Sequence, residues 1–86
     1  MRREYTIIDE AGLHARPASL LVQVATKFPN EINIEYKGRK MILKSIMIVM
    51  SLGVSQNTTI AIEVDGDNAE EVFTALEEVL NSNNLI

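Results

Sequence analysis

The stretch EINIEYKGRKMIL, residues 31–43, decides the fold class of this chain. Polar and apolar residues alternate strictly over Glu31–Tyr36, which predicts a strand with one buried and one solvated face. Lys37-Gly38 predicts a tight turn, and Arg39–Leu43 predicts the strand that returns from it. The apolar face of this hairpin must be covered by other elements of the chain.

The flanking segments supply two more strands and two amphipathic helices. Alternating patterns predict strands over Arg3–Ile8 and Thr59–Val64. Apolar residues recur at helical spacing from just after His14 to about Lys27, and again over Ala69–Leu80. The polar tail that follows the last helix, residues 81–86, is expected to fray.

The apolar run that begins at Ile46 is compatible with two structures. Its periodicity does not separate a short helix from a buried strand. Ser45 before the run and Gly53 after it are cap signals, however, and they favour a helix over residues 46–52. The expected order is then β-α-β-β-α-β-α, an α+β sandwich in which three helices cover one face of an antiparallel sheet.

The amino-acid composition of the chain excludes several classes of function. The chain has 86 residues, which predicts a single domain over 1–86, and a net charge of −4, which disfavours direct nucleic-acid binding. It has no cysteine and one histidine, so a disulfide scaffold and a thiolate site are excluded and a metal site is a poor interpretation. No targeting segment is evident, and no apolar run has the ~20 residues of a membrane span. We therefore expect a cytoplasmic protein.

The segment Gly12-Leu13-His14-Ala15-Arg16-Pro17-Ala18 carries the chemistry. The first N–H groups of a helix have no partner within it, and together with the helix dipole they form an anion site. Pro17 is tolerated in a first turn, and Gly12 frees the loop before it. His14 beside this site is a fair nucleophile toward phosphorus, and Arg16 adds a permanent charge suited to phosphate oxygens. A capping or surface role for His14 is the plainer alternative.

These residues resemble the active-site signature of HPr, the histidine-containing phosphocarrier family of the bacterial sugar phosphotransferase system. Lys44-Ser45-Ile46-Met47 and Val49-Met50-Ser51-Leu52-Gly53 resemble the second signature of the family, in its Gram-positive type. The resemblance extends over the whole chain. It implies an open-faced sandwich whose antiparallel sheet has the order 1-4-2-3.

The resemblance also implies a function and partners. The histidine matching His14 accepts phosphate on Nδ1 from Enzyme I, which draws it from phosphoenolpyruvate, and passes it to the IIA domains of sugar permeases. The arginine matching Arg16 helps to neutralise the phosphoryl group, and the proline matching Pro17 shapes the helix start. Such a carrier is a stoichiometric relay protein and not an enzyme. We expect it to need no cofactor or metal and to be a monomer.

Ser45 has a structural and a regulatory interpretation. The structural one is the helix cap. By resemblance to Gram-positive relatives, Ser45 is also a target of HPr kinase/phosphorylase, and the modified protein is a corepressor of the catabolite control protein. Phosphorylation adds about −1.5 to −2 charges at the start of a helix, where the dipole favours them. We therefore expect the added charge to block a docking surface and to leave the fold intact.

Ile46, Met47 and Met50 are the candidate docking residues. A helix of six residues cannot bury all of its apolar side chains against one sheet, and methionine suits a surface that fits several partners. The same residues could instead belong to the core. Position 48 is Ile48, where the Gram-positive pattern has glycine, so the details of partner recognition are expected to differ there.

Other classes of protein function fit the sequence less well. No nucleophile elbow surrounds any serine, and no P-loop is present. The alternative that competes most closely is a regulatory binding protein that acts through Ser45 and not in sugar uptake. The resemblance implies that such relatives lack the active-site histidine, so His14 counts against it. An inert α+β interaction module is the third interpretation.

Overall fold

The hairpin quoted above forms as its sequence predicts. In the computed structural model, which describes residues 1–86, the hairpin consists of β2 (Ile32–Tyr36) and β3 (Arg39–Ile42), with Tyr36 paired to Arg39. Lys37 and Gly38 between them have φ angles of 50° and 79°. Two consecutive positive φ angles identify the type I′ turn, whose twist matches that of the two strands.

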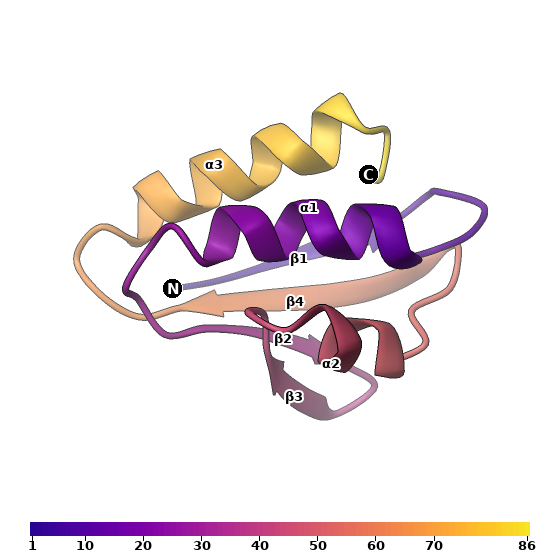
Figure 1. Cartoon of the computed structure of the whole chain (residues 1–86), viewed down its shortest axis with the longest axis horizontal. Helices are drawn as coiled ribbons and strands as arrows, with labels where there is room; N and C mark the ends of the chain where they lie inside the picture. The colour runs from indigo at the N-terminus through magenta and orange to yellow at the C-terminus, as the bar shows by residue number, and fades with distance from the viewer.

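The remaining elements complete a four-stranded antiparallel sheet covered by three helices (Figure 1). They are β1 (Arg2–Ile7), α1 (Ala15–Ala25), α2 (Ile46–Ser51), β4 (Thr58–Val64) and α3 (Ala69–Ser82). The strand order is β1-β4-β2-β3, and β4 pairs antiparallel with both β1 and β2. The α+β sandwich with sheet order 1-4-2-3 is therefore confirmed.

The helices lie on one face of the sheet, and the core fills the space between the two layers. Figure 1 shows α1 and α3 side by side across the sheet, with the shorter α2 beside α1. The core is a cluster of 22 buried side chains, and no polar or charged side chain is buried. Its sheet side consists of the inward residues of the alternating strands, among them Ile34, Ile60 and Ile62. The alternation of polar and apolar residues along the strands therefore determines which face of the sheet the helices cover.

The segment of residues 46–52 forms a helix, as its cap signals indicate. The Ser45 hydroxyl accepts a hydrogen bond from the N–H of Ile48 at 3.4 Å, and Gly53 after the helix has a φ of 68°. Lys44 fixes the entry to this helix, because its ammonium donates to the carbonyl oxygens of Phe28 and Asn30, both at 2.7 Å. The start of α2 is therefore tied to the loop that follows α1.

The prediction that the tail frays was wrong. Helix α3 continues to Ser82, two residues beyond the predicted end, and Leu85 is 1% exposed. The N–H of Leu85 donates to the carbonyl oxygen of Leu80 at 2.9 Å, and the carbonyl oxygen of Leu85 accepts from the N–H of Ile8 at 2.8 Å. The tail is held because one apolar side chain reaches the core and its backbone pairs with the segment after β1.

A cluster of polar side chains holds β1 against α3. The Tyr5 hydroxyl and the Arg3 guanidinium both donate to the Glu77 carboxylate, at 2.6 and 3.0 Å. These hydrogen bonds hold the pKa of Glu77 below its ordinary value of 4.5. Burial, reinforced by the neighbouring carboxylate, raises the pKa of Tyr5. Arg3 also lies 4.9 Å above the ring of Phe73, so one side chain makes both a charge and a cation–π contact.

Candidate functional site

His14 is the N-cap residue of α1, and its side chain makes no hydrogen bond within the chain. Its backbone is extended, with φ −77° and ψ −172°, and its carbonyl oxygen accepts from the N–H of Ala18 at 3.0 Å. The imidazole caps no backbone group and is 43% exposed. The ring therefore stands in solvent at the start of a helix, as the sequence predicts.

Two backbone donors beside the ring have no partner. Helix α1 begins at Ala15, so the N–H groups of Ala15 and Arg16 point out of its first turn, and neither donates a hydrogen bond within the chain. Pro17, the next residue, has no N–H and is buried. The helix start thus offers two adjacent amides and a positive dipole end to an anion that is attached to the ring.

Gly12 brings the loop before His14 against another loop. It has a φ of 65°, and a Cβ atom there would lie 2.0 Å from the carbonyl oxygen of Val54. The N–H of Leu13 donates to that same oxygen at 3.1 Å. The loop also contacts the segment after Val54, because the side-chain amide of Gln56 donates to the carbonyl oxygen of Ile8 at 3.1 Å. Close backbone contact, which only glycine permits here, fixes the position of His14.

Two charged residues bear on His14: Arg16, two residues later in the chain, which the sequence predicts, and Asp9, which it does not. The Arg16 side chain is exposed and makes no ion pair in the structure, so its guanidinium is available to an incoming anion. An oxygen of Asp9 lies 3.8 Å from Nε2 of the His14 ring. The sequence pattern identifies Asp9 only as a residue of the loop after the first strand. Aspartate commonly stabilises a turn by accepting a hydrogen bond from the N–H two residues later. Asp9 accepts in this way from Ala11, and the resulting turn places its carboxylate near the ring.

The second group of predicted residues lies on α2. Ser45 is half-exposed, and Ile46, Met47 and Met50 are 38%, 83% and 43% exposed. These three apolar side chains are open to partners, whereas Val49 of the same helix is fully buried. Ile48 is half-buried, so it adds less to the exposed apolar surface than Met47 does. Helix α2 packs beside α1, and the segment that leaves α2 contacts the loop before His14.

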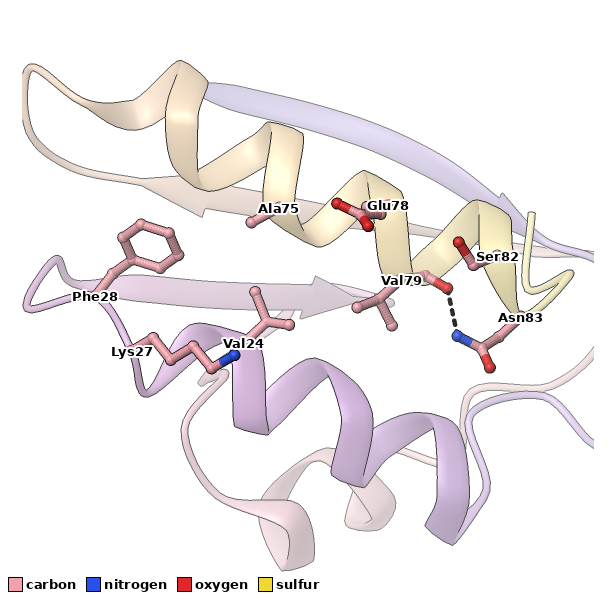
Figure 2. A pocket seen from close by; sticks show the side chains of 8 residues that line it. All are labelled: Val24, Lys27, Phe28, Ala75, Glu78, Val79, Ser82 and Asn83. Carbon is pink, nitrogen blue, oxygen red and sulfur yellow. Dashed lines mark hydrogen bonds between the residues drawn. The ribbon is translucent and has the colours of Figure 1, made fainter.

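A groove between α1 and α3 lies apart from this site. The cavity there has a volume of about 370 Å³. Figure 2 shows its lining side chains, with Lys27 and Phe28, which follow α1, on one side and Glu78 of α3 on the other. Val24, the one lining residue on α1, belongs to the end of that helix opposite His14. No group of three or more His, Asp and Glu side chains is close enough to hold a metal ion. None of the three helices combines the length and apolar character of a membrane span.

A comparison with known protein families covers nearly the whole chain. Residues 1–82 match the family model described as the PTS HPr component phosphorylation site. The chain belongs to the HPr family. The phosphocarriers of this family are carriers and not catalysts, and the predicted membership is confirmed.

Solved HPr structures resemble the chain over nearly its whole length. The histidine-containing phosphocarrier protein of Mycoplasma is 37% identical, with a TM-score of 0.95 over 100% of this chain and 98% of that one. An HPr from Thermoanaerobacter tengcongensis is 43% identical, with a TM-score of 0.87 over 95% and 92% of the two chains.

The comparisons include one regulatory relative. The Bacillus subtilis catabolite repression protein Crh is 34% identical, with a TM-score of 0.72 over 93% and 92% of the two chains, and that structure is a swapped dimer. A monomer therefore remains a prediction for the chain described above.

Replacement of Gly12 by alanine tests the contact with Val54. Gly12→Ala adds a clash with a backbone oxygen to the strain of a positive φ, and we expect it to lower the free energy of unfolding by at least about 3 kcal/mol. Gly38→Ala is the matched control, because Gly38 has a φ of 79° and open space around it. That variant should lose only about 1 kcal/mol. Urea denaturation measures both, and equal losses would contradict the importance of the loop contact.

Proposed function

We propose that this HPr-family chain carries a phosphoryl group on His14, receiving it from Enzyme I and delivering it to the IIA domains of sugar permeases. The observation that carries the proposal is an exposed imidazole at a helix start, beside two unpaired amides and followed two residues later by Arg16, whose guanidinium makes no ion pair. On this proposal the protein is a cytoplasmic, single-domain relay protein. It needs no cofactor, because each transfer exchanges one phosphorus bond for another.

The transfer requires no bond-breaking group beyond the ring itself. The lone pair of the ring nitrogen attacks phosphorus, and the bond between phosphorus and the donor breaks with its electron pair leaving on the donor. The phosphoryl oxygens then accept from the N–H groups of Ala15 and Arg16, and the Arg16 guanidinium offsets their charge. Because His14 is exposed, the group stays accessible to the next acceptor.

Two substitutions test this assignment. His14→Ala should abolish labelling of the protein by Enzyme I and phosphoenolpyruvate, because no other side chain of the chain is an imidazole. Arg16→Ala should slow labelling about ten-fold or more, the size of a lost charge-assisted hydrogen bond. Arg39→Ala is the control, since Arg39 is also exposed and unpaired but lies in the β2–β3 turn region. Acid-labile phosphate that persists on His14→Ala would refute the assignment.

We also propose that phosphorylation of Ser45 regulates the protein through the surface of α2. Ser45 is the N-cap of α2, and the exposed side chains of Ile46 and Met47 follow it directly. A phosphate there gains from the helix dipole and from the nearby N–H groups, so the helix is preserved. The charge instead makes an apolar docking surface hydrophilic. HPr kinase/phosphorylase and the catabolite control protein are the partners that this proposal implies.

A charge at Ser45 should therefore reduce docking without unfolding the protein. We expect Ser45→Asp to keep its circular dichroism spectrum and to accept phosphate from Enzyme I several-fold more slowly. Ser82→Asp, at the end of α3, adds the same charge far along the chain from α2 and should leave the rate unchanged. An unchanged rate for Ser45→Asp in a folded protein would contradict control through the α2 surface.

The similarity to Crh supports a second candidate function, a regulatory protein that acts through Ser45 and has no part in sugar uptake. The labelling experiment separates the two candidates. A carrier is labelled by Enzyme I on His14, whereas a purely regulatory protein is labelled only by a kinase on Ser45. The exposed His14 and its unpaired amides favour the carrier.

A further inference from the structure

Asp9 is the only acidic residue with a carboxylate oxygen within 4.0 Å of a ring nitrogen of His14. Its Oδ1 atom lies 3.8 Å from Nε2. The same oxygen accepts a hydrogen bond from the N–H of Ala11 at 2.8 Å, which fixes the carboxylate within the loop between β1 and α1. Asp9 is 27% exposed, less than the ring it faces, so it is the more firmly held member of the pair.

This placement makes the two ring nitrogens unequal. A neutral imidazole has a hydrogen on one nitrogen and a lone pair on the other. A carboxylate near Nε2 favours the form in which Nε2 has the hydrogen, because that N–H dipole points toward negative charge. The lone pair is then on Nδ1, the nitrogen that Asp9 does not face.

We propose that Asp9 is a positioning residue for phosphoryl transfer, which holds His14 in the Nε2–H form so that Nδ1 is the nucleophile. The inference rests on the proposed function of His14 and adds a residue to it. Asp9 acts through the ring and touches no phosphoryl group. Its carboxylate also faces the positive charge that the ring gains when both nitrogens are substituted.

The step balances with a small phosphoryl donor such as phosphoramidate. The Nδ1 lone pair forms the new N–P bond, the P–N bond of phosphoramidate breaks, and its electron pair leaves with ammonia, which takes a proton from water. The Nε2 hydrogen remains on the ring during the attack. The ring then has a positive charge opposite Asp9, and it loses that charge when Nε2 later releases its proton.

The expected effect of Asp9 is modest because the pair is partly exposed. The N–O distance of 3.8 Å is longer than a hydrogen bond, so the interaction is one of charge and not of a shared proton. Exposed pairs of this kind change an equilibrium or a rate by about two- to five-fold. Salt screens such an effect, whereas a loop that is misplaced would slow transfer equally at any salt concentration.

Asp9→Asn is the variant that isolates the charge. Asparagine keeps an oxygen for the N–H of Ala11 and therefore preserves the loop. Glu10→Gln is the matched control, because Glu10 is the adjacent residue, is exposed and makes no ion pair in the structure, and its replacement changes the net charge equally.

Two measurements on the full chain decide the question. The ¹⁵N chemical shifts of the neutral His14 ring report which nitrogen has the hydrogen, and phosphoramidate labelling reports the rate without any partner protein. We expect Asp9→Asn to shift the ring toward the Nδ1–H form and to slow labelling about two- to five-fold at ~0.01 M salt, with the difference vanishing near ~1 M. Glu10→Gln should match the unmodified protein in both.

The possible failures are distinct. If Asp9→Asn leaves the ring in the same form and is labelled at the rate of Glu10→Gln, the role of Asp9 is overturned while His14 remains the acceptor. If Asp9→Asn slows labelling equally at low and high salt, the loop and not the charge is responsible, and the inference is again overturned. A chain that Enzyme I does not label at all would refute the proposed function, whereas the ring measurement on Asp9 would still stand.

Discussion

Close approach of the backbone at Gly12 to the carbonyl oxygen of Val54 is the constraint on which the site depends. It joins the loop after β1 to the loop after α2, and it requires a residue without a Cβ atom at a positive φ. Because the N–H of Leu13 donates a hydrogen bond to the same oxygen, the backbone is held in position just before α1 begins. His14 follows directly after this hydrogen-bonded position, and its ring remains exposed to solvent. The first turn of α1 after it is anchored by the buried side chain of Pro17.

The exposure of the ring follows from that anchoring and has a chemical consequence. A histidine that serves as a structural cap accepts a hydrogen bond from a backbone N–H with its side chain. The His14 side chain makes no such bond. The donors it leaves free, on Ala15 and Arg16, are the ones that a phosphoryl group attached to the ring can accept from. On the proposed function, the fold places two free donors next to the nucleophile, and phosphorylation of Ser45 would add charge to the exposed apolar side chains of α2.

Local patterns predicted the elements well because each element satisfies its own requirements. The alternation over residues 31–36 and the Lys37-Gly38 turn fix the hairpin without reference to the rest of the chain. The tail was mispredicted because its stability is not local. A run rich in asparagine gives no sign that the Leu85 side chain reaches the core or that its carbonyl oxygen accepts from the N–H of Ile8, near the other end of the chain. Asp9 escaped notice for the same reason, as only the folded loop brings its carboxylate to the ring.

The most direct test of the central claim is a comparison of backbone amide signals before and after phosphorylation of the protein. If the phosphoryl group on His14 is held by the helix start, the N–H protons of Ala15 and Arg16 should shift strongly downfield in the ¹⁵N–¹H spectrum and exchange with solvent more slowly. Amides of the sheet should be unmoved. Phosphorylation of His14 that left both of these signals in place would show that the helix start does not bind the group, and the account would be wrong.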